Sequence, residues 1–319
     1  MNRRELLQSL ALGTGATWLS SATSSTPLLA AETSPQGKRT ARLAHLTDVH
    51  LYQKRSAAEG LTKVLRHVQS LDDPPELLIN GGDAIYDALA VDRDQLEAQW
   101  ALWKNTWKAE CALPVKHCLG NHDVWGWDKP GSKTTGNEPG WGKQYSLDQL
   151  GLERGYYGFD VGGWRILVLD SMTADDETVY RGELDAAQFE WLKDELTNTP
   201  ATTPIAIVSH IPIVTVGGLE FQEHVKQDPR KRRMLSHQDA TALVHLFRKH
   251  PNLKLCLSGH THLTERISFS GIDFVNSGAV SGLWWKGNHY HTDEGYNVID
   301  LYDDGTFATN YMSYGWTVG

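Results

Sequence analysis

Apolar segments of two kinds alternate along most of this chain of 319 residues. Short, continuous runs of strand-like residues occupy positions 41–46, 76–79, 115–119, 204–208 and 253–257. Longer segments have apolar positions at helical spacing, at 57–70, 91–110, 186–198 and 237–250, and the last two follow Asp185 and Ser236 as expected N-caps. Because strands and helices alternate in this order, the pattern predicts an α/β fold.

The pattern changes after residue 263, where strand-like segments follow one another directly. They occupy positions 266–269, 272–275, 296–301 and 307–311, with Gly or Asp-Gly turns at several of the breaks between them. Alternating elements followed by consecutive strands predict a mixed-sheet sandwich flanked by helices.

Residues that bind metals follow each of the five strand-like runs of the first part of the chain. These residues are Asp48 and His50, Asp83, Asn121 with His122 and Asp123, His210, and His260 and His262. Open α/β sheets gather their functional residues at the carboxyl ends of strands, so we expect all of them at one edge. Carboxylate, amide and imidazole groups without a thiolate suit a pair of divalent ions, with Asp83 as the natural bridge.

Each of these motifs is weak when it is considered alone. A single Asp-x-His, or a lone His after a strand, is usually a residue of a turn or of the core. Five such motifs in order, all after strand-like runs, favour a functional site.

The order Asp-x-His, Gly-Asp, Gly-Asn-His-Asp, His and Gly-His-x-His resembles the calcineurin-like metallophosphoesterases from residue 41 to the C-terminus. This resemblance implies a four-layer α/β/β/α sandwich of two mixed sheets flanked by helices. It also implies two metal sites, with a hydroxide between the ions as the nucleophile. The implied ligands are Asp48, His50, Asp83 and His262 for the first metal, and Asp83, Asn121, His210 and His260 for the second.

The same resemblance places His122 at the phosphate of the substrate, where it stabilises charge or protonates the leaving oxygen. Asp123 would then orient the imidazole of His122, since a carboxylate fixes the tautomer of its histidine partner. The expected activity is hydrolysis of a small phosphate ester, either a monoester or a diester, with two ions of Fe, Mn or Zn. Neither the native metals nor the oligomeric state follows from the sequence.

Tyr86 supports an alternative class of enzyme, a monoesterase similar to the purple acid phosphatases. The segment Gly-Asp-x-x-Tyr that ends at Tyr86 is similar to a motif of the purple acid phosphatases, where the tyrosine binds ferric iron. One coordination position does not easily take both His50 and Tyr86, so we expect His50 to bind and Tyr86 to pack nearby. A non-catalytic binding protein of the same fold is a further alternative, although such a protein is expected to lose ligands that this chain keeps.

Three tryptophans are candidates for substrate contacts: Trp125, Trp284 and Trp285. The first lies in a segment of residues 124–143 that is rich in Gly, Pro and Trp, and long loops of this kind are commonly functional. The other two follow the last histidine motif. Packing within the loops is the competing interpretation for all three.

The first 31 residues resemble a twin-arginine export signal, with Arg3 and Arg4 before a weakly apolar stretch. We therefore expect a single catalytic domain over residues 32–319, exported to the periplasm or secreted. The apolar stretch is too short and interrupted for a membrane span, which needs about 20 apolar residues. An ordinary flexible N-terminus is the alternative.

The acidic composition does not resemble that of a protein that binds polyphosphate or nucleic acid. The formal net charge of −9 does not favour specific binding of nucleic acid, and residues 230–233 form the one basic run, either a solvated face or a guide for phosphate. Three cysteines are too few for a disulfide framework. Cys256 is expected in the core, whereas Cys111 and Cys118 could pair or be buried thiols.

Overall fold

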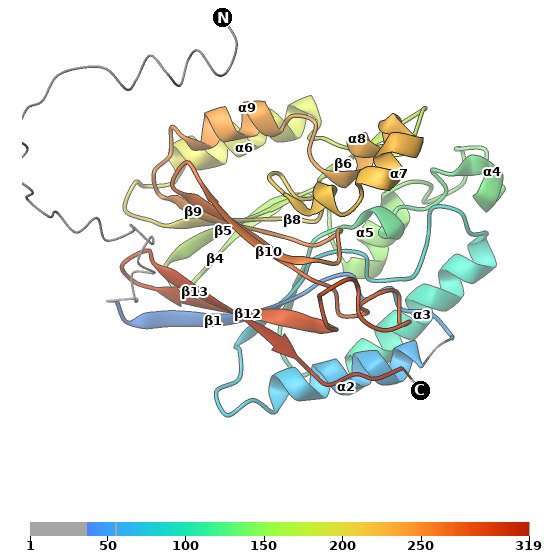
Figure 1. Ribbon diagram of the computed structural model, residues 1–319, viewed down its shortest axis with the longest axis horizontal. Helices are drawn as coiled ribbons and strands as arrows, with labels where there is room; N and C mark the ends of the chain where they lie inside the picture. Colours follow the sequence, from blue (N-terminus) through green and yellow to red (C-terminus); the bar gives the residue numbers. More distant parts are fainter. Residues whose placement is uncertain (1–36, 55, 319) are drawn as a thin grey trace, which may run out of the picture. The chain divides into compact units, whose positions relative to one another are not determined.

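Two β-sheets organise the part of the chain that the computed structural model describes, residues 37–54 and 56–318 (Figure 1). The predicted leader, residues 1–31, lies outside the described residues and stays a prediction. The first sheet has five strands in the order β13 (Phe307–Ser313), β12 (Gly295–Tyr302), β1 (Arg39–Leu46), β2 (Leu77–Asn80) and β3 (Val115–His117). Strands β1, β2 and β3 are parallel, whereas β12 is antiparallel to both of its neighbours.

The second sheet has six strands and is mixed as well. Its order is β10 (Thr264–Phe269), β11 (Ile272–Ser277), β9 (Leu253–Ser258), β8 (Ile205–Ser209), β5 (Trp164–Leu169) and β4 (Tyr157–Val161). The four central strands are parallel, and the two edge strands are antiparallel to their neighbours. A separate hairpin consists of β6 (Met172–Asp175) and β7 (Val179–Gly182).

Helices cover the outer face of each sheet, which gives the predicted four layers (Figure 1). Helices α2 (Ala57–Gln69) and α3 (Arg93–Glu110) lie against the five-stranded sheet, and α6 (Ala186–Asn198) and α9 (Ala240–Phe247) lie against the six-stranded sheet. Apolar side chains of both sheets fill the space between them. Short helices lie in the connections: α4 (Lys129–Ser132), α5 (Gln144–Leu150), α7 (Gln222–Gln227) and α8 (Arg232–Leu235).

Local capping explains where the helices begin. The Asp185 side chain accepts the N–H of Gln188 at 2.8 Å, so α6 begins where the sequence predicts. The Asp92 side chain accepts the N–H of Gln95 at 3.1 Å, so α3 begins two residues later than predicted. Ser236 is not the cap of α9, which begins only at Ala240.

The late start of α9 has a tertiary cause. His237 is buried, and its Nδ1 lies 2.8 Å from the Asp239 carboxylate while its Nε2 lies 3.1 Å from Ser209 Oγ. The backbone N–H of His237 donates to the carbonyl of Pro212. These bonds hold the segment in a non-helical conformation, so the predicted first turn does not form.

The three cysteines are free thiols in the structure. Cys118 and Cys256 are buried in the core between or beside the sheets, and burial raises the pKa of both. Cys111 is half-buried at the end of α3. All three therefore behave as small hydrophobic residues here.

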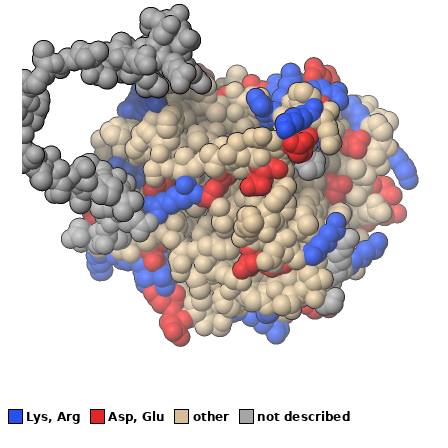
Figure 2. Space-filling model, in the orientation of Figure 1, with Lys and Arg blue, Asp and Glu red and all other residues tan. Residues whose placement is uncertain are grey.

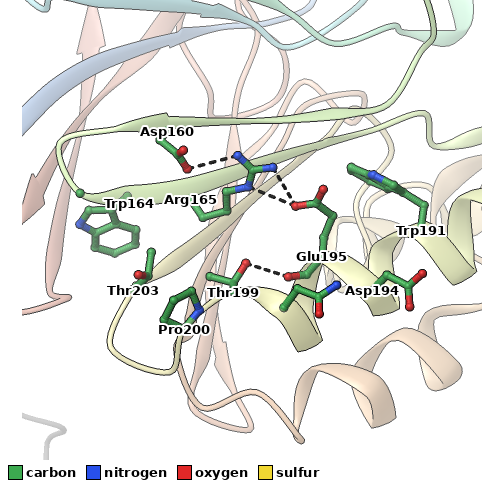
Figure 3. Close-up of a pocket in the computed structure, with 11 residues that line it drawn as sticks. Asp160, Trp164, Arg165, Trp191, Asp194, Glu195, Thr199, Pro200 and Thr203 are labelled. Carbon is green, nitrogen blue, oxygen red and sulfur yellow. Dashed lines mark hydrogen bonds and ion pairs between the residues drawn. The ribbon is translucent and has the colours of Figure 1, made fainter.

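A polar cavity of about 520 Å³ lies at the amino ends of β5 and β8, beside the C-terminal part of α6 (Figure 3). Arg165 projects into it, and its guanidinium is 2.8 Å from Glu195 and 3.2 Å from Asp160. Because two carboxylates already neutralise this cation, the cavity has no charge left to attract an anion. It also lies at the opposite end of the strands from the predicted site.

The face of the molecule that Figure 2 displays has no single dominant charge. Figure 2 shows Lys and Arg side chains interspersed with Asp and Glu among a majority of other residues on the face it displays. Among the helices in residues 37–54 and 56–318, none combines the length and the apolar character that crossing a bilayer requires.

Candidate metal centre

The predicted ligands follow the carboxyl ends of five parallel strands, β1, β2, β3, β8 and β9. Backbone hydrogen bonds tie the loops after these strands to one another. The N–H of Asp48 donates to Gly82 O at 3.0 Å, the N–H of His50 to Asp83 O at 2.9 Å, and the N–H of Gly259 to His210 O at 3.0 Å. Segments that are far apart in the sequence therefore form one rigid edge.

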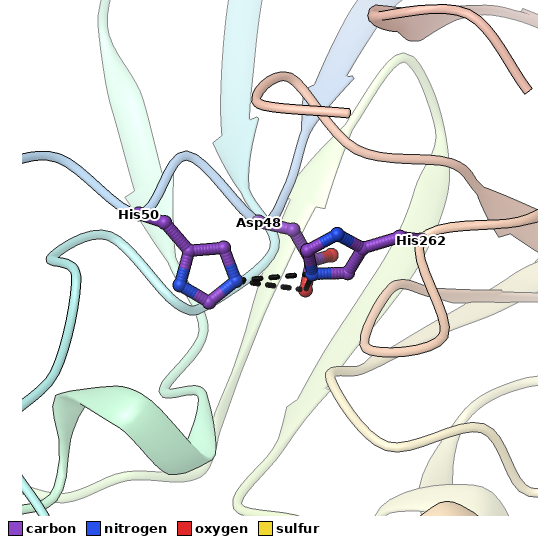
Figure 4. A group of neighbouring side chains, drawn as sticks. All are labelled: Asp48, His50 and His262. Carbon is purple, nitrogen blue, oxygen red and sulfur yellow. Dashed lines mark hydrogen bonds and ion pairs between the residues drawn. The ribbon is translucent and has the colours of Figure 1, made fainter. Parts of the chain in front are cut away.

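The side chains at this edge form two groups that could each hold a metal ion. In each group the potential ligand atoms lie within 4.8 Å of one another: Asp48, His50 and His262 in the first group (Figure 4), and Asp83, His210 and His260 in the second. Asn121 belongs beside the second group, because its Oδ1 lies 3.2 Å from His210 Nε2. This division is the one that the sequence resemblance implies.

Asp83 lies between the two groups. Its Oδ2 is 3.2 Å from His210 Nε2 in the second group and 3.6 Å from His50 Nε2 in the first. Its other oxygen, Oδ1, accepts the backbone N–H of His122 at 2.8 Å. One carboxylate oxygen thus faces both groups, as a carboxylate that bridges two ions must.

Backbone carbonyls fix the tautomers of three histidines. His210 Nδ1 donates to Gly81 O at 2.9 Å, His260 Nε2 to Met234 O at 2.8 Å, and His262 Nδ1 to Gly282 O at 2.6 Å. Because a carbonyl only accepts, each of these nitrogens carries a proton, and in the neutral imidazole the other ring nitrogen has a lone pair for a cation. These three residues therefore fit metal ligands by their chemistry as well as by their position.

His50 is held in a different way. Its Nδ1 is buried without a hydrogen-bond partner in the structure, and its Nε2 points to His262 Nε2 at 3.0 Å and to Asp83. The indole of Trp284 stacks on the His50 ring with centroids 3.7 Å apart. Among the described residues, the stacked Trp284 and the contact with His262 orient this imidazole, and no carbonyl holds its Nδ1.

Two buried carboxylates govern the electrostatics. Burial opposes the ionisation of Asp48, but His262 and His210 outweigh it and lower the Asp48 pKa. Burial likewise opposes ionisation of Asp83, where His210 and His122 lower the pKa well below its ordinary value. For His210, burial lowers the pKa, but Asp83 and Asp48 raise it to about 9. The arrangement therefore favours positive charge between the carboxylates, which cations bound there would supply.

His50 and His260 also lie near these carboxylates, and burial keeps both of them neutral. Burial lowers the pKa of His50 well below its ordinary value, and it lowers that of His260 to about 4. A neutral imidazole is the form that coordinates a metal. The donor set therefore fits a pair of divalent ions.

The backbone at the site is in the left-handed region, which is uncommon for residues with a side chain. This holds for Asp48 (φ 55°), His50 (47°), Asp83 (53°), His260 (71°) and His262 (58°). Each such residue costs about 1–3 kcal/mol, and strain of this kind concentrates at functional sites. Gly120 and Gly259 permit the close packing, since a Cβ at either would overlap the carboxylate of Asp83 or Asp48.

The partner of His122 differs from the prediction. His122 Nδ1 lies 3.1 Å from the carboxylate of Asp87, which the sequence analysis did not single out. Asp123 instead accepts the backbone N–H groups of Ala84 and Gly120, each at 2.9 Å, and is fully buried. Asp123 therefore supports the loops, and the orienting position belongs to Asp87. Its spacing of four residues after Asp83 is the signal that could have suggested it.

Burial lowers the pKa of His122, but the charge of Asp83 and the hydrogen bond to Asp87 outweigh it, so the pKa is raised. The side chain remains 23% exposed. Its ring lies edge-on to His50, with centroids 5.2 Å apart. His122 is therefore a protonatable group that a substrate at the centre can reach.

Only one of the three candidate tryptophans lies at the site. Trp284 contacts His50 and also lies edge-on to His122, with ring centroids 4.7 Å apart. Trp125 is 2% exposed and donates to Val91 O at 3.1 Å, and Trp285 is 1% exposed and donates to Val49 O at 2.9 Å. Both are core residues, so their predicted role in substrate binding is wrong.

Tyr86 packs near the centre, as expected. Its ring stacks on Tyr52 with centroids 4.2 Å apart and lies edge-on to Trp284 at 5.0 Å. These contacts give Tyr86 a place in an aromatic cluster beside the first group.

Comparisons with known proteins show which proteins this chain is similar to. A 3′,5′-cyclic-nucleotide phosphodiesterase of Nostoc sp. is 23% identical over 282 residues, which cover 84% of this chain and 90% of the relative. A probable cyclic nucleotide phosphodiesterase of Rhodococcus erythropolis is 24% identical over 242 residues, covering 72% of this chain and 67% of the relative.

Among solved structures, a dimetal phosphatase from Danio rerio superimposes with a TM-score of 0.62 at 15% identity, over 87% of this chain and 97% of that one. At this identity the likeness concerns the fold. The family model of the calcineurin-like phosphoesterases matches residues 41–263, which include every predicted ligand. The chain therefore belongs to the calcineurin-like phosphoesterase family and is a hydrolase of phosphoric esters.

Proposed function

We propose that this protein hydrolyses small phosphodiesters at a centre of two divalent metal ions. The observation that carries the proposal is the position of Asp83 Oδ2 between two groups of fixed ligands, at 3.2 Å from His210 Nε2 and 3.6 Å from His50 Nε2. The relatives whose names state a cyclic nucleotide phosphodiesterase activity support a diester substrate.

The ion pairs of the two buried carboxylates bear on the choice between a diester and a monoester. A monoester carries a charge of about −1.5 to −2 at neutral pH, whereas a diester carries a single negative charge. Within the described chain, the ion-pair partners of Asp48 and Asp83 are histidines rather than Lys or Arg. The second charge of a monoester would therefore depend on the bound ions and on cations outside these ion pairs, such as Lys231 in the pocket beside His260.

The ions, when bound, would act as Lewis acids and lower the pKa of coordinated water. Asp48, His50, Asp83 and His262 would hold the first, and Asp83, Asn121, His210 and His260 the second. The protein's own contribution is to fix these ligands and to present His122. Asp87 accepts from His122 Nδ1, so Nε2 is the nitrogen that would donate a proton or a hydrogen bond to the phosphate or the leaving oxygen.

A ferric centre ligated by Tyr86 is the second candidate. The stacking of Tyr86 on Tyr52 supports a packing role instead, and His50 is already directed at the first group. We therefore propose His50, and not Tyr86, as the ligand.

The test compares esters that share one leaving group. Protein purified with its metals would be assayed with p-nitrophenyl phosphate and bis(p-nitrophenyl) phosphate, and then with adenosine 3′,5′-cyclic phosphate. We expect higher kcat/KM for the diester, about two metal ions per chain by elemental analysis, and loss of activity on chelation. A preference for the monoester, or full activity of the metal-free protein, would contradict the proposal.

A further inference from the structure

A largely apolar pocket of about 640 Å³ adjoins the second ligand group. The metal-ligand candidate His260 forms part of its lining. One wall comes from the segment that contains α7 and α8, including Phe221 and Met234, and the other from the loop after β11, including Leu283 and Tyr290. The volume lies in the range of about 300–1,000 Å³ that is usual for sites of small organic ligands.

Residues that line the pocket contact candidate ligands of both groups. The carbonyl of Met234 accepts the Nε2–H of His260 at 2.8 Å, so the α8 wall also sets the orientation of a candidate ligand. On the other side, the ring of His289, which lines the pocket, meets the ring of His262 edge-on with centroids 5.7 Å apart. A phosphate held at the centre would therefore have one of its organic substituents at the mouth of this pocket.

Aromatic rings from both walls meet at the pocket. Phe221 lies nearly parallel to His289, with centroids 6.1 Å apart, and edge-on to Tyr290 at 6.2 Å. Tyr290 is 46% exposed and Leu283 is 38% exposed, although both are large and apolar. Apolar surface that gathers in a groove beside a polar centre is typical of a ligand-binding site.

The pocket also has polar groups at its border. Lys231 lines it, together with the imidazole of His289 and the phenol of Tyr290. An alkyl chain cannot form hydrogen bonds with such groups. A nucleobase, in contrast, has flat faces that stack on aromatic side chains and polar edges that form hydrogen bonds. A planar, partly polar ring is therefore the occupant that fits both features.

We propose that this pocket binds the nucleobase of a nucleotide phosphodiester, with Phe221 and Tyr290 as the residues that determine the preference for it. The proposal rests on the proposed function, since it places the phosphate at the metal centre. It adds that the enzyme recognises the nucleobase of its substrate and that Phe221 and Tyr290 are the side chains that recognise it.

The experiment uses three diesters with the same p-nitrophenolate leaving group and a different second substituent. These are thymidine 5′-(p-nitrophenyl phosphate), methyl p-nitrophenyl phosphate and octyl p-nitrophenyl phosphate. For the metal-loaded wild type we expect kcat/KM to be highest for the thymidine ester. The Phe221→Ala and Tyr290→Ala variants should lower the ratio of thymidine to methyl ester by about 5- to 100-fold, the effect of removing a side chain that stacks on a base.

Phe269→Ala is the matched control. Phe269 is 45% exposed on β10 and packs over Arg248, outside the residues that line the pocket. Its replacement removes a ring of the same size and should leave the ratio unchanged. Because Tyr290 is 46% exposed and Phe221 is only partly buried, their variants are expected to fold, which circular dichroism would verify.

Equal ratios in the wild type and both pocket variants would overturn the proposal. A preference for the octyl ester that is lost in the variants would also overturn it, in favour of an aliphatic substituent. If the wild type hydrolyses none of the three esters, the proposed function fails, and calorimetry then decides the pocket separately. In that measurement, thymidine 5′-phosphate must bind the metal-loaded protein more tightly than methyl phosphate, and Phe221→Ala must remove the difference.

Discussion

The two ligand groups use the same kinds of side chain but differ in how these are held. In the second group, backbone carbonyls fix both histidines, through His210 Nδ1 at 2.9 Å and His260 Nε2 at 2.8 Å. In the first group, His262 is fixed in the same way, whereas His50 Nδ1 has no hydrogen-bond partner among the described residues and the ring stacks on Trp284.

The difference has a consequence for metal binding. Partners that orient a ligand contribute about 10- to 100-fold to metal affinity. A carbonyl fixes both the tautomer and the ring angle of a histidine, whereas a stacked ring restricts the angle but leaves the tautomer free. We therefore expect the first group to bind its ion more weakly and to exchange it first.

The largest effect should come from the residue that both groups share. Asp83→Asn removes a negative charge that faces both groups, so we expect loss of both ions and a fall in rate of more than about 10³-fold. Elemental analysis and steady-state kinetics would measure this. Tyr86→Phe is the control and should keep both ions and most of the activity. The reverse pattern, or a visible charge-transfer band that Tyr86→Phe abolishes, would favour the tyrosine-ligated iron centre.

Replacement of His122 tests the chemical step separately from metal binding. His122→Ala should keep both ions while the rate falls by about 10²–10⁴-fold, because the side chain acts mainly in the transition state. The defect should be smaller for nitrophenyl esters than for alkyl esters if His122 protonates the leaving group. Equal defects would indicate electrostatic stabilisation alone, and unchanged activity would exclude His122 from the reaction.

Asp87 should act through His122 and not on the ions. Asp87→Asn removes the carboxylate 3.1 Å from His122 Nδ1, so we expect a fall in kcat of about 10-fold and unchanged metal content. Because this carboxylate raises the His122 pKa, the acidic form of His122 should be lost at lower pH in the variant. A pH–rate profile measures the shift. The same profile in Asp87→Asn and the wild type would assign Asp87 a structural role only.

Replacement of Trp284 tests whether the first ligand group is held less firmly than the second. Trp284→Ala leaves His50 without its stacked neighbour, so the ion of the first group should be lost at about 10-fold lower chelator concentration while the second ion stays. Titration with a chelator and elemental analysis would follow the two ions. Trp191→Ala, on α6 at the opposite end of the strands, controls for the loss of an indole. Loss of both ions together would show that the two groups are not held independently.

His117 shows how burial changes the pKa of a histidine when no carboxylate contributes to the change. Burial is the main cause that lowers its pKa to about 4, and the amide nitrogen of Asn80 lies 3.3 Å from Nδ1, which accepts only when neutral. The folded pKa lies below the unfolded value of 6.5, so the unfolded chain binds more protons between these values. Stability is therefore lost as the pH falls from 6.5 towards 4, by up to about 3 kcal/mol.

Denaturant unfolding at pH 7 and pH 5 measures this effect. His117→Gln should reduce the loss of stability between the two values, because glutamine gains no proton in this range. His245→Gln, at an exposed position of α9, controls for the removal of a histidine. An identical loss in His117→Gln and the wild type would show that other groups govern the acid sensitivity.

Predictions from the sequence succeeded where local patterns decide the structure. The strand-like runs and the N-cap at Asp185 were visible in the sequence, because burial patterns and capping depend on neighbouring residues. The predicted start of α9 after Ser236 was wrong, because His237 bonds to Ser209 on another element. A contact of that kind leaves no trace in the local pattern.

The same distinction applies to the site. The sequence alone determined the family, the fold class and the positions of the potential ligands, since each ligand directly follows a strand and strand ends are set locally. Only the tertiary structure decided which carboxylate reaches His122 and which tryptophan faces the centre. Asp123 directly follows His122 in the sequence, whereas Asp87 is 35 residues away, and Trp284 and Trp285 are adjacent. Which member of each pair points into the site depends on left-handed backbone and on packing between distant loops, and these follow only from the complete fold.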